Sequence, residues 1–109
     1  MKISFDEIDE KVIEHFFDGE GAYITRMAIV NDNKIMRGCL KPGCSIGTHT
    51  HNGACEFIFI TSGYGKAVCD GVEERLSAGD CHHCPEGSTH TLINSGSDDL
   101  TFFAVVAKQ

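Results

Sequence analysis

Residues 43–63 read GCSIGTHTHNGACEFIFITSG, and this stretch carries the features that decide the fold. His49 and His51 lie two positions apart in a strand-like segment, so their imidazoles point to the same face. Glu56 has the opposite parity, so the chain must turn before it, and residues 52–54, Asn-Gly-Ala, supply that turn. The Glu56 carboxylate can then fold back from the next strand to meet both imidazoles.

A third imidazole follows in residues 85–90, PEGSTH, where His90 comes after a tight turn. Three imidazoles and one carboxylate suit divalent Zn, Mn, Fe, Ni or Cu. Structural zinc sites favour cysteine-rich tetrahedra, so this set is more typical of a metal with positions open to water or substrate. Without a cation, desolvating these groups together is costly. We therefore predict one divalent metal ion on His49, His51, Glu56 and His90.

The rest of the chain after residue 21 is short, strand-like and punctuated by turn signals such as Asp70-Gly71. Strands this short and regular indicate an all-β sandwich or barrel and not βαβ units. The predicted strands are 23–30, 35–40, 45–51, 56–62, 65–70, 73–77, 80–84, 90–94 and 100–107.

The N-terminal part of the chain contains the one helical pattern. Residues 6–17 place apolar side chains at i, i+4, i+5 and i+8, counted from Ile8, and this spacing predicts a short helix. Asp6 is its expected cap, and Gly19 is expected to end it. On this helix His15 is expected to lie on the surface without a role.

Composition and charge restrict the class of protein. The 109 residues fit one domain, 1–109, and the formal net charge is −7 with the basic residues scattered singly. This charge disfavours nucleic acid and anionic membrane surfaces as partners. The N-terminus lacks the pattern of a secretory signal, which predicts a cytoplasmic protein whose six cysteines are mostly reduced.

Two segments together resemble the motifs of the cupin superfamily. Residues 43–63 resemble the first motif, Gly, five residues, His-x-His, four residues, Glu, six residues, Gly. Residues 79–94 resemble the second, Gly, five residues, Pro, one residue, Gly, two residues, His, three residues, Asn. The resemblance is to a small single-domain metal-binding cupin of the conserved-barrel type. It implies an antiparallel jelly-roll barrel, or double-stranded β-helix, with the metal near its open end.

The same resemblance implies ligand roles for the three histidines and the glutamate named above, but it does not name a reaction, because cupins have diverse activities. We predict a metal-dependent enzyme acting on a small oxygenated molecule, as a dioxygenase, isomerase or lyase. The alternative is a non-catalytic cupin that binds or senses a small ligand, with a structural or ligand-holding metal. The sequence does not identify the substrate or the metal.

Other residues yield further predictions. His82 takes a position of the second motif that is usually apolar, so its ring should face the barrel interior. It is either a core histidine with its hydrogen bonds satisfied or a polar group of the cavity, and in the second case it is the candidate catalytic acid or base. Cys81 and Cys84 lie three apart on a strand and so cannot readily share an ion. Phe57 and Phe59 point away from the interior, so another sheet or a second subunit should cover them. With the apolar last strand, they lead us to predict a homodimer.

Overall fold

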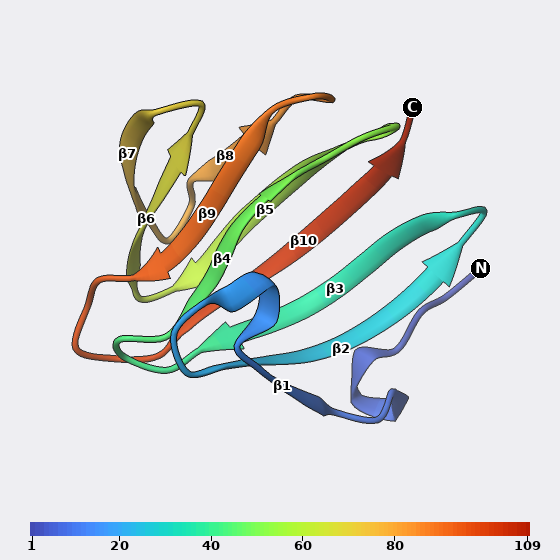
Figure 1. Ribbon diagram of the computed structural model, residues 1–109. Coiled ribbons are helices and arrows are strands. Elements are labelled where there is room, and N and C mark those ends of the chain that lie inside the picture. The colour runs from blue at the N-terminus through green and yellow to red at the C-terminus, as the bar shows by residue number, and fades with distance from the viewer.

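The strands of this protein form two antiparallel sheets that face each other, as Figure 1 shows for the computed structural model, which describes residues 1–109. The larger sheet has the order β1-β2-β3-β10-β5-β8, and the smaller has the order β4-β9-β6-β7. The strands are β1 (Lys11–Glu14), β2 (Ala22–Val30), β3 (Asn33–Leu40), β4 (Ser45–Thr50), β5 (Ala54–Ser62), β6 (Tyr64–Cys69), β7 (Val72–Ser77), β8 (Cys81–Cys84), β9 (Thr89–Asn94) and β10 (Leu100–Lys108). This arrangement confirms the predicted all-β, antiparallel jelly roll.

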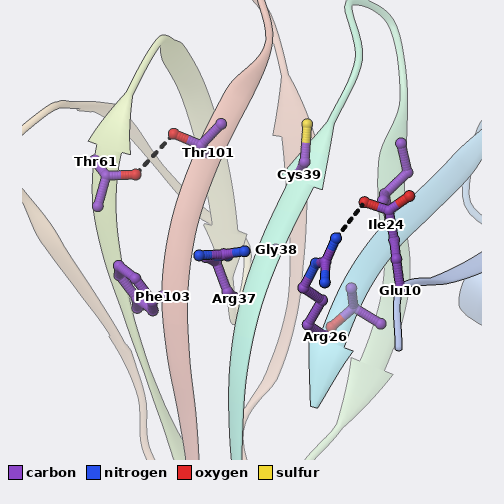
Figure 2. A pocket seen from close by; sticks show the side chains of 10 residues that line it. Glu10, Ile24, Arg26, Arg37, Gly38, Cys39, Thr61, Thr101 and Phe103 are labelled. Atoms are coloured by element: carbon purple, nitrogen blue, oxygen red, sulfur yellow. Dashed lines mark hydrogen bonds and ion pairs between the residues drawn. The ribbon is translucent and has the colours of Figure 1, made fainter. Parts of the chain in front are cut away.

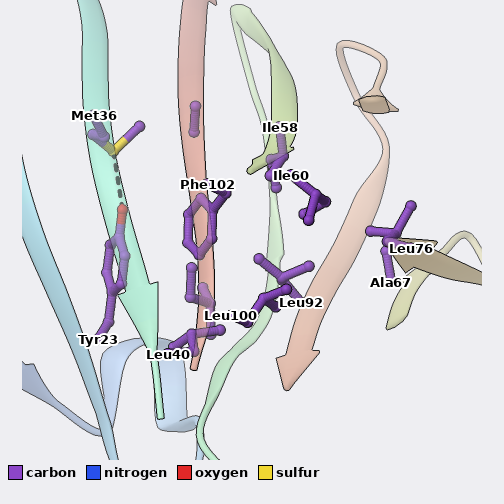
Figure 3. Packing of buried hydrophobic residues seen from close by; sticks show 12 residues of the cluster. Tyr23, Met36, Leu40, Ile58, Ile60, Ala67, Leu76, Leu92, Leu100 and Phe102 are labelled. Atoms are coloured by element: carbon purple, nitrogen blue, oxygen red, sulfur yellow. Dashed lines mark hydrogen bonds between the residues drawn. The ribbon is translucent and has the colours of Figure 1, made fainter. Parts of the chain in front are cut away.

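The hydrophobic core lies between the two sheets (Figure 3). Successive side chains of a strand point to opposite faces, so every second side chain of β5 points into the core. Ile58 and Ile60 therefore share the inner face of β5 with Glu56. The Tyr23 ring stacks on Phe102 with centroids 5.9 Å apart. The buried residues of the core are Tyr23, Met36, Leu40, Ile46, Ile58, Ile60, Ala67, Leu76, Leu92, Leu100, Phe102 and Ala104.

The N-terminal segment differs from its prediction: no helix covers residues 6–17. Two short 3-10 turns, η1 (Phe5–Glu7) and η2 (Phe16–Asp18), flank strand β1 instead, and β1 pairs with β2. His15 and Phe17 have φ of 51° and 52°, in the left-handed region that a right-handed helix cannot contain. Sheet pairing therefore overrides the helical spacing of the apolar residues. No helix of the structure is long and apolar enough to cross a membrane.

The outer face of the larger sheet keeps exposed aromatic side chains. Phe59 is 45% exposed and Phe103 36% exposed, and the Phe57 ring stacks on His83 with centroids 4.5 Å apart. The N-terminal segment covers part of this face, because the ring centroids of Phe5 and Phe103 lie 5.4 Å apart. The outward direction of Phe57 and Phe59 agrees with strand parity, and the homodimer stays a prediction.

Candidate metal centre

Two neighbouring strands of the smaller sheet bring the three predicted histidines together. His49 on β4 lies opposite His90 on β9 in the strand register. The turn before β9 holds His51 through its backbone, since the Gly87 N–H donates to the His51 carbonyl at 2.7 Å and the His51 N–H donates to the Ser88 carbonyl at 3.1 Å. Gly87 has φ of 82°, a conformation that favours glycine. The motif glycine therefore shapes the turn that fixes two ligands relative to each other.

Glu56 approaches the histidines from the other sheet, on the inner face of β5. Its Oε1 lies 3.1 Å from His51 Nε2 and 3.0 Å from His90 Nε2. The Nε2 atom of His90 lies 3.1 Å from those of both His49 and His51. One ligand atom from each of the four residues thus falls within 4.8 Å of all the others.

These spacings fit a metal ion. Two atoms each about 2.1 Å from one ion lie about 3.0 Å apart at a right angle and about 3.4 Å apart at a tetrahedral angle. The four contacts of 3.0–3.1 Å are therefore as close together as the ligand atoms of one ion would be. The His49 Nδ1–H donates to the Gly47 carbonyl at 2.7 Å, which leaves the Nε2 lone pair turned toward the cluster.

The electrostatics of the cluster also suit a cation. Burial lowers the pKa of His49, and its neighbours His90 and His51 lower it further against the opposing effect of the Gly47 carbonyl. Burial alone would raise the pKa of the Glu56 carboxyl, but the imidazoles of His51 and His90 beside it outweigh burial and bring the pKa to about 2. At neutral pH the site therefore offers the neutral imidazole of His49 and the ionised carboxylate of Glu56, which are the forms that bind metal.

A cavity of about 150 Å³ opens beside the cluster. Lys34 on β3 is the one lysine or arginine that lines it. The Phe17 ring stacks on His49 with centroids 4.3 Å apart and forms part of the cavity wall. The sequence patterns did not single out either residue, because no local motif marks them. The residues lining the cavity are Phe16, Phe17, Tyr23, Lys34, Met36, Ile46, His49, Thr50, His51, Glu56 and Val106.

The close approach of η2 to β4 holds Phe17 over the cluster. A Cβ atom added to Gly47 would lie 1.8 Å from the Phe17 carbonyl oxygen, and one added to Gly19 would lie 2.2 Å from the Ser45 carbonyl oxygen. Both glycines are therefore needed for backbone to pack on backbone here. The left-handed backbone at Phe17 is the local strain that directs its ring onto His49.

His82 faces the interior, as its strand parity predicts, and is 1% exposed. It does not line the cavity but lies behind His90, with its Nε2 3.0 Å from His90 Nδ1. Its Nδ1 lies 2.5 Å from Glu74 Oε1, so both ring nitrogens have partners. The catalytic role of His82 stays a prediction. In the same strand Cys81 is exposed and Cys84 buried, which confirms that they face opposite ways.

A larger hollow, of about 280 Å³, lies on the outer face of the larger sheet (Figure 2). Arg26 and Arg37 line it, but both guanidinium groups are already paired. Arg26 donates to the Ile8 carbonyl at 2.7 Å, and Arg37 donates to the Asp6 carboxylate at 2.8 Å. These contacts fasten the N-terminal segment to the sheet, so the smaller cavity at the histidines is the better functional candidate.

Comparison with known proteins supports this assignment of the site. The family model described as Cupin domain matches residues 36–106, which include all four candidate ligands. The oxalate-binding protein of Thermotoga maritima is 30% identical over 112 residues, covering 97% of this chain and 93% of that protein.

Solved structures agree on the fold. A crystal structure described as a predicted oxalate decarboxylase from Thermotoga maritima superposes with a TM-score of 0.93, at 29% identity and with 100% of both chains covered. A cupin sugar phosphate isomerase from Silicibacter pomeroyi superposes with a TM-score of 0.81 at 22% identity, covering 100% of this chain and 76% of that chain. The second likeness shows the fold alone, which accommodates different activities.

Proposed function

Because this chain belongs to the cupin domain family, we propose that it binds one divalent metal ion and holds a small dicarboxylate, such as oxalate, against that ion. The proposed ligands are His49, His51, Glu56 and His90. One observation carries the proposal: four ligand atoms converge beside a small cavity whose only lysine or arginine is Lys34.

The charges of the site favour a dianion. Neutral imidazoles leave the charge of a divalent ion unchanged, and the Glu56 carboxylate reduces it to a net charge of about +1. Lys34 adds a second positive charge to the same cavity. A dicarboxylate balances both charges, whereas a neutral or cationic ligand does not. Apolar walls such as Phe17 and Met36 lower the local dielectric constant and strengthen this attraction.

The size of the cavity restricts the ligand further. Pockets for drug-sized molecules commonly enclose about 300–1,000 Å³, and this cavity encloses about 150 Å³. A ligand with few atoms is therefore expected. The name of the Thermotoga maritima oxalate-binding protein supports oxalate as the first compound to test.

Turnover is the second candidate function, as a metal-dependent dioxygenase, isomerase or lyase. A bound Zn, Mn, Fe, Ni or Cu ion would polarise a carboxylate oxygen of the substrate. Apart from His49, His51 and Glu56, the titratable side chains that line the cavity are Lys34 and Tyr23. Burial raises the pKa of Tyr23 to about 12, so it stays protonated at neutral pH. Lys34 is then the one charged side chain, other than the proposed ligands, that lines the cavity and could contact a substrate.

Calorimetric titration of the Mn²⁺-loaded protein with oxalate tests the proposal. We expect saturable binding that weakens at least about tenfold in Lys34→Met, because this variant loses one charge and keeps the aliphatic stem. Lys11→Met is the matched control, since Lys11 lies on β1 and does not line the cavity. Unchanged oxalate binding in Lys34→Met would contradict the role of Lys34. Release of carbon dioxide from oxalate during the titration would favour the enzyme.

We also propose that two copies of the chain associate through the outer face of the larger sheet, and that the protein works in the cytoplasm. The exposed ring of Phe59 supports the homodimer, since burying apolar area favours association by about 25 cal/mol per Å² before the entropy of association is subtracted.

A further inference from the structure

The buried imidazole of His82 joins the candidate metal centre to the protein surface. β7 and β8 are edge strands of opposite sheets, and the side chains of Glu74 and His82 meet between them. His82 also contacts His90, so three side chains form one continuous row of hydrogen bonds. The outer end of the row is open to solvent, since the Glu74 side chain is 50% exposed.

With both rings neutral and Glu74 ionised, the hydrogen bonds of the row can run in only one direction. A carboxylate has acceptors alone, so His82 Nδ1 must carry a hydrogen to reach Glu74. In the neutral ring, His82 Nε2 is then an acceptor, and His90 Nδ1 must carry the hydrogen of the next bond. The Nε2 atom of His90 is left with a free lone pair, and this atom faces His49, His51 and Glu56.

We infer that Glu74 and His82 are positioning residues of the metal centre, which select the metal-binding tautomer of His90 and fix the angle of its ring. The inference rests on the proposed metal site. His49 has its tautomer set by the backbone carbonyl of Gly47, which a side-chain substitution does not remove. His90 depends on side chains for the same purpose, and the ring planes of His82 and His90 are within 20° of parallel.

A merely structural role accounts for the position of His82 less well. An apolar side chain at position 82 would leave the His90 Nδ1–H without a partner in the interior. Neither Glu74 nor His82 lines the cavity. Substitutions in the row therefore change the ligand without changing the space for a small anion.

Two variants and one control test the inference by Zn²⁺ affinity, measured in competition with a chelator. His82→Leu removes the acceptor and should weaken Zn²⁺ binding about 10- to 100-fold, the usual effect of losing a partner behind a ligand. Glu74→Gln keeps the size, but its amide can donate as well as accept, so both tautomers of His90 become possible and Zn²⁺ binding should weaken about tenfold. Glu73→Gln is the matched control, because Glu73 pairs with Lys66 at 3.3 Å, away from the row.

Imidazole ¹⁵N NMR of the metal-free protein gives a readout that packing alone would not change. We expect His90 to carry its hydrogen on Nδ1 in the wild type and in Glu73→Gln, and a mixture of tautomers in Glu74→Gln. Wild-type Zn²⁺ affinity together with an unchanged His90 tautomer in Glu74→Gln would overturn the inference. If His82→Leu fails to fold, Glu74→Gln still decides, because its side chain is half exposed.

Failure of the proposed function gives a different result. If the wild type and Glu73→Gln bind no Zn²⁺, the metal site itself is wrong, and the NMR of metal-free protein then tests the row of hydrogen bonds alone. If the wild type binds Zn²⁺ but Glu74→Gln and His82→Leu bind it equally well, the metal site stands and the positioning role falls.

Discussion

Replacing Glu56 by glutamine removes one negative charge from the centre of the site and almost no volume. Glu56 is 8% exposed, and its Oε1 lies within 3.1 Å of two imidazole nitrogens. The fold should survive, because the amide oxygen of glutamine can occupy the place of Oε1. Metal affinity should fall, because the carboxylate is the one anionic ligand of the set.

The magnitude follows from the pKa of Glu56, which is lowered from 4.5 to about 2. This difference corresponds to about 3 kcal/mol in favour of the charged over the neutral carboxyl. A divalent ion at the same place attracts the carboxylate at least as strongly as the imidazoles do. Each 1.4 kcal/mol is a factor of ten, so Glu56→Gln should weaken metal binding at least about 100-fold.

Competition with a fluorescent chelator measures this affinity, and circular dichroism checks that the variant keeps its strands. Glu86→Gln, in the exposed turn before β9, is the matched control for the loss of one charge. A metal affinity of Glu56→Gln within about threefold of the wild type would refute the reasoning, because losing the anionic ligand should lower the affinity by much more than that.

Three further predictions follow from the same site and surface. Acidification to pH 4 should release the metal by protonating His49, whose pKa burial lowers, while the lowered pKa of Glu56 keeps its carboxylate ionised until the pH approaches about 2; metal retained at pH 4 would contradict this. Adding metal at 100 times its Kd should stabilise the wild-type fold by about 2.7 kcal/mol and raise its Tm by about 10 °C in differential scanning fluorimetry. The same addition should leave the Tm of the double variant His49→Ala/His51→Ala unchanged. Sedimentation at micromolar concentration should show twice the 11.9 kDa mass of one chain, and Phe59→Glu should sediment as a monomer; an 11.9 kDa wild-type species would exclude the homodimer.

The candidate ligands could be predicted because their arrangement is local. A two-residue spacing on a strand puts His49 and His51 on one face, and a glycine turn returns Glu56 to them. His90 required the motif spacing, since its approach to His49 depends on how β4 and β9 pair. The four ligand atoms converge as these patterns predict.

Other parts of the site depend on contacts between distant segments. Lys34 lines the cavity only because of where β3 lies, and no local pattern marks it. The spacing of apolar residues predicted a helix over 6–17, and pairing with β2 placed Phe17 at the cavity instead. The position of His82 in the second motif predicted a ring that faces the interior, but only the packing of the two sheets identifies Glu74 as its partner.

The metal content of the protein tests the central claim most directly. Wild-type protein and His49→Ala/His51→Ala, purified without chelators and dialysed together against Zn²⁺ and then metal-free buffer, can be compared by inductively coupled plasma mass spectrometry. We predict about one ion per chain in the wild type and less than about one tenth of an ion per chain in the double variant. A full metal load in the double variant would contradict the assignment of the site.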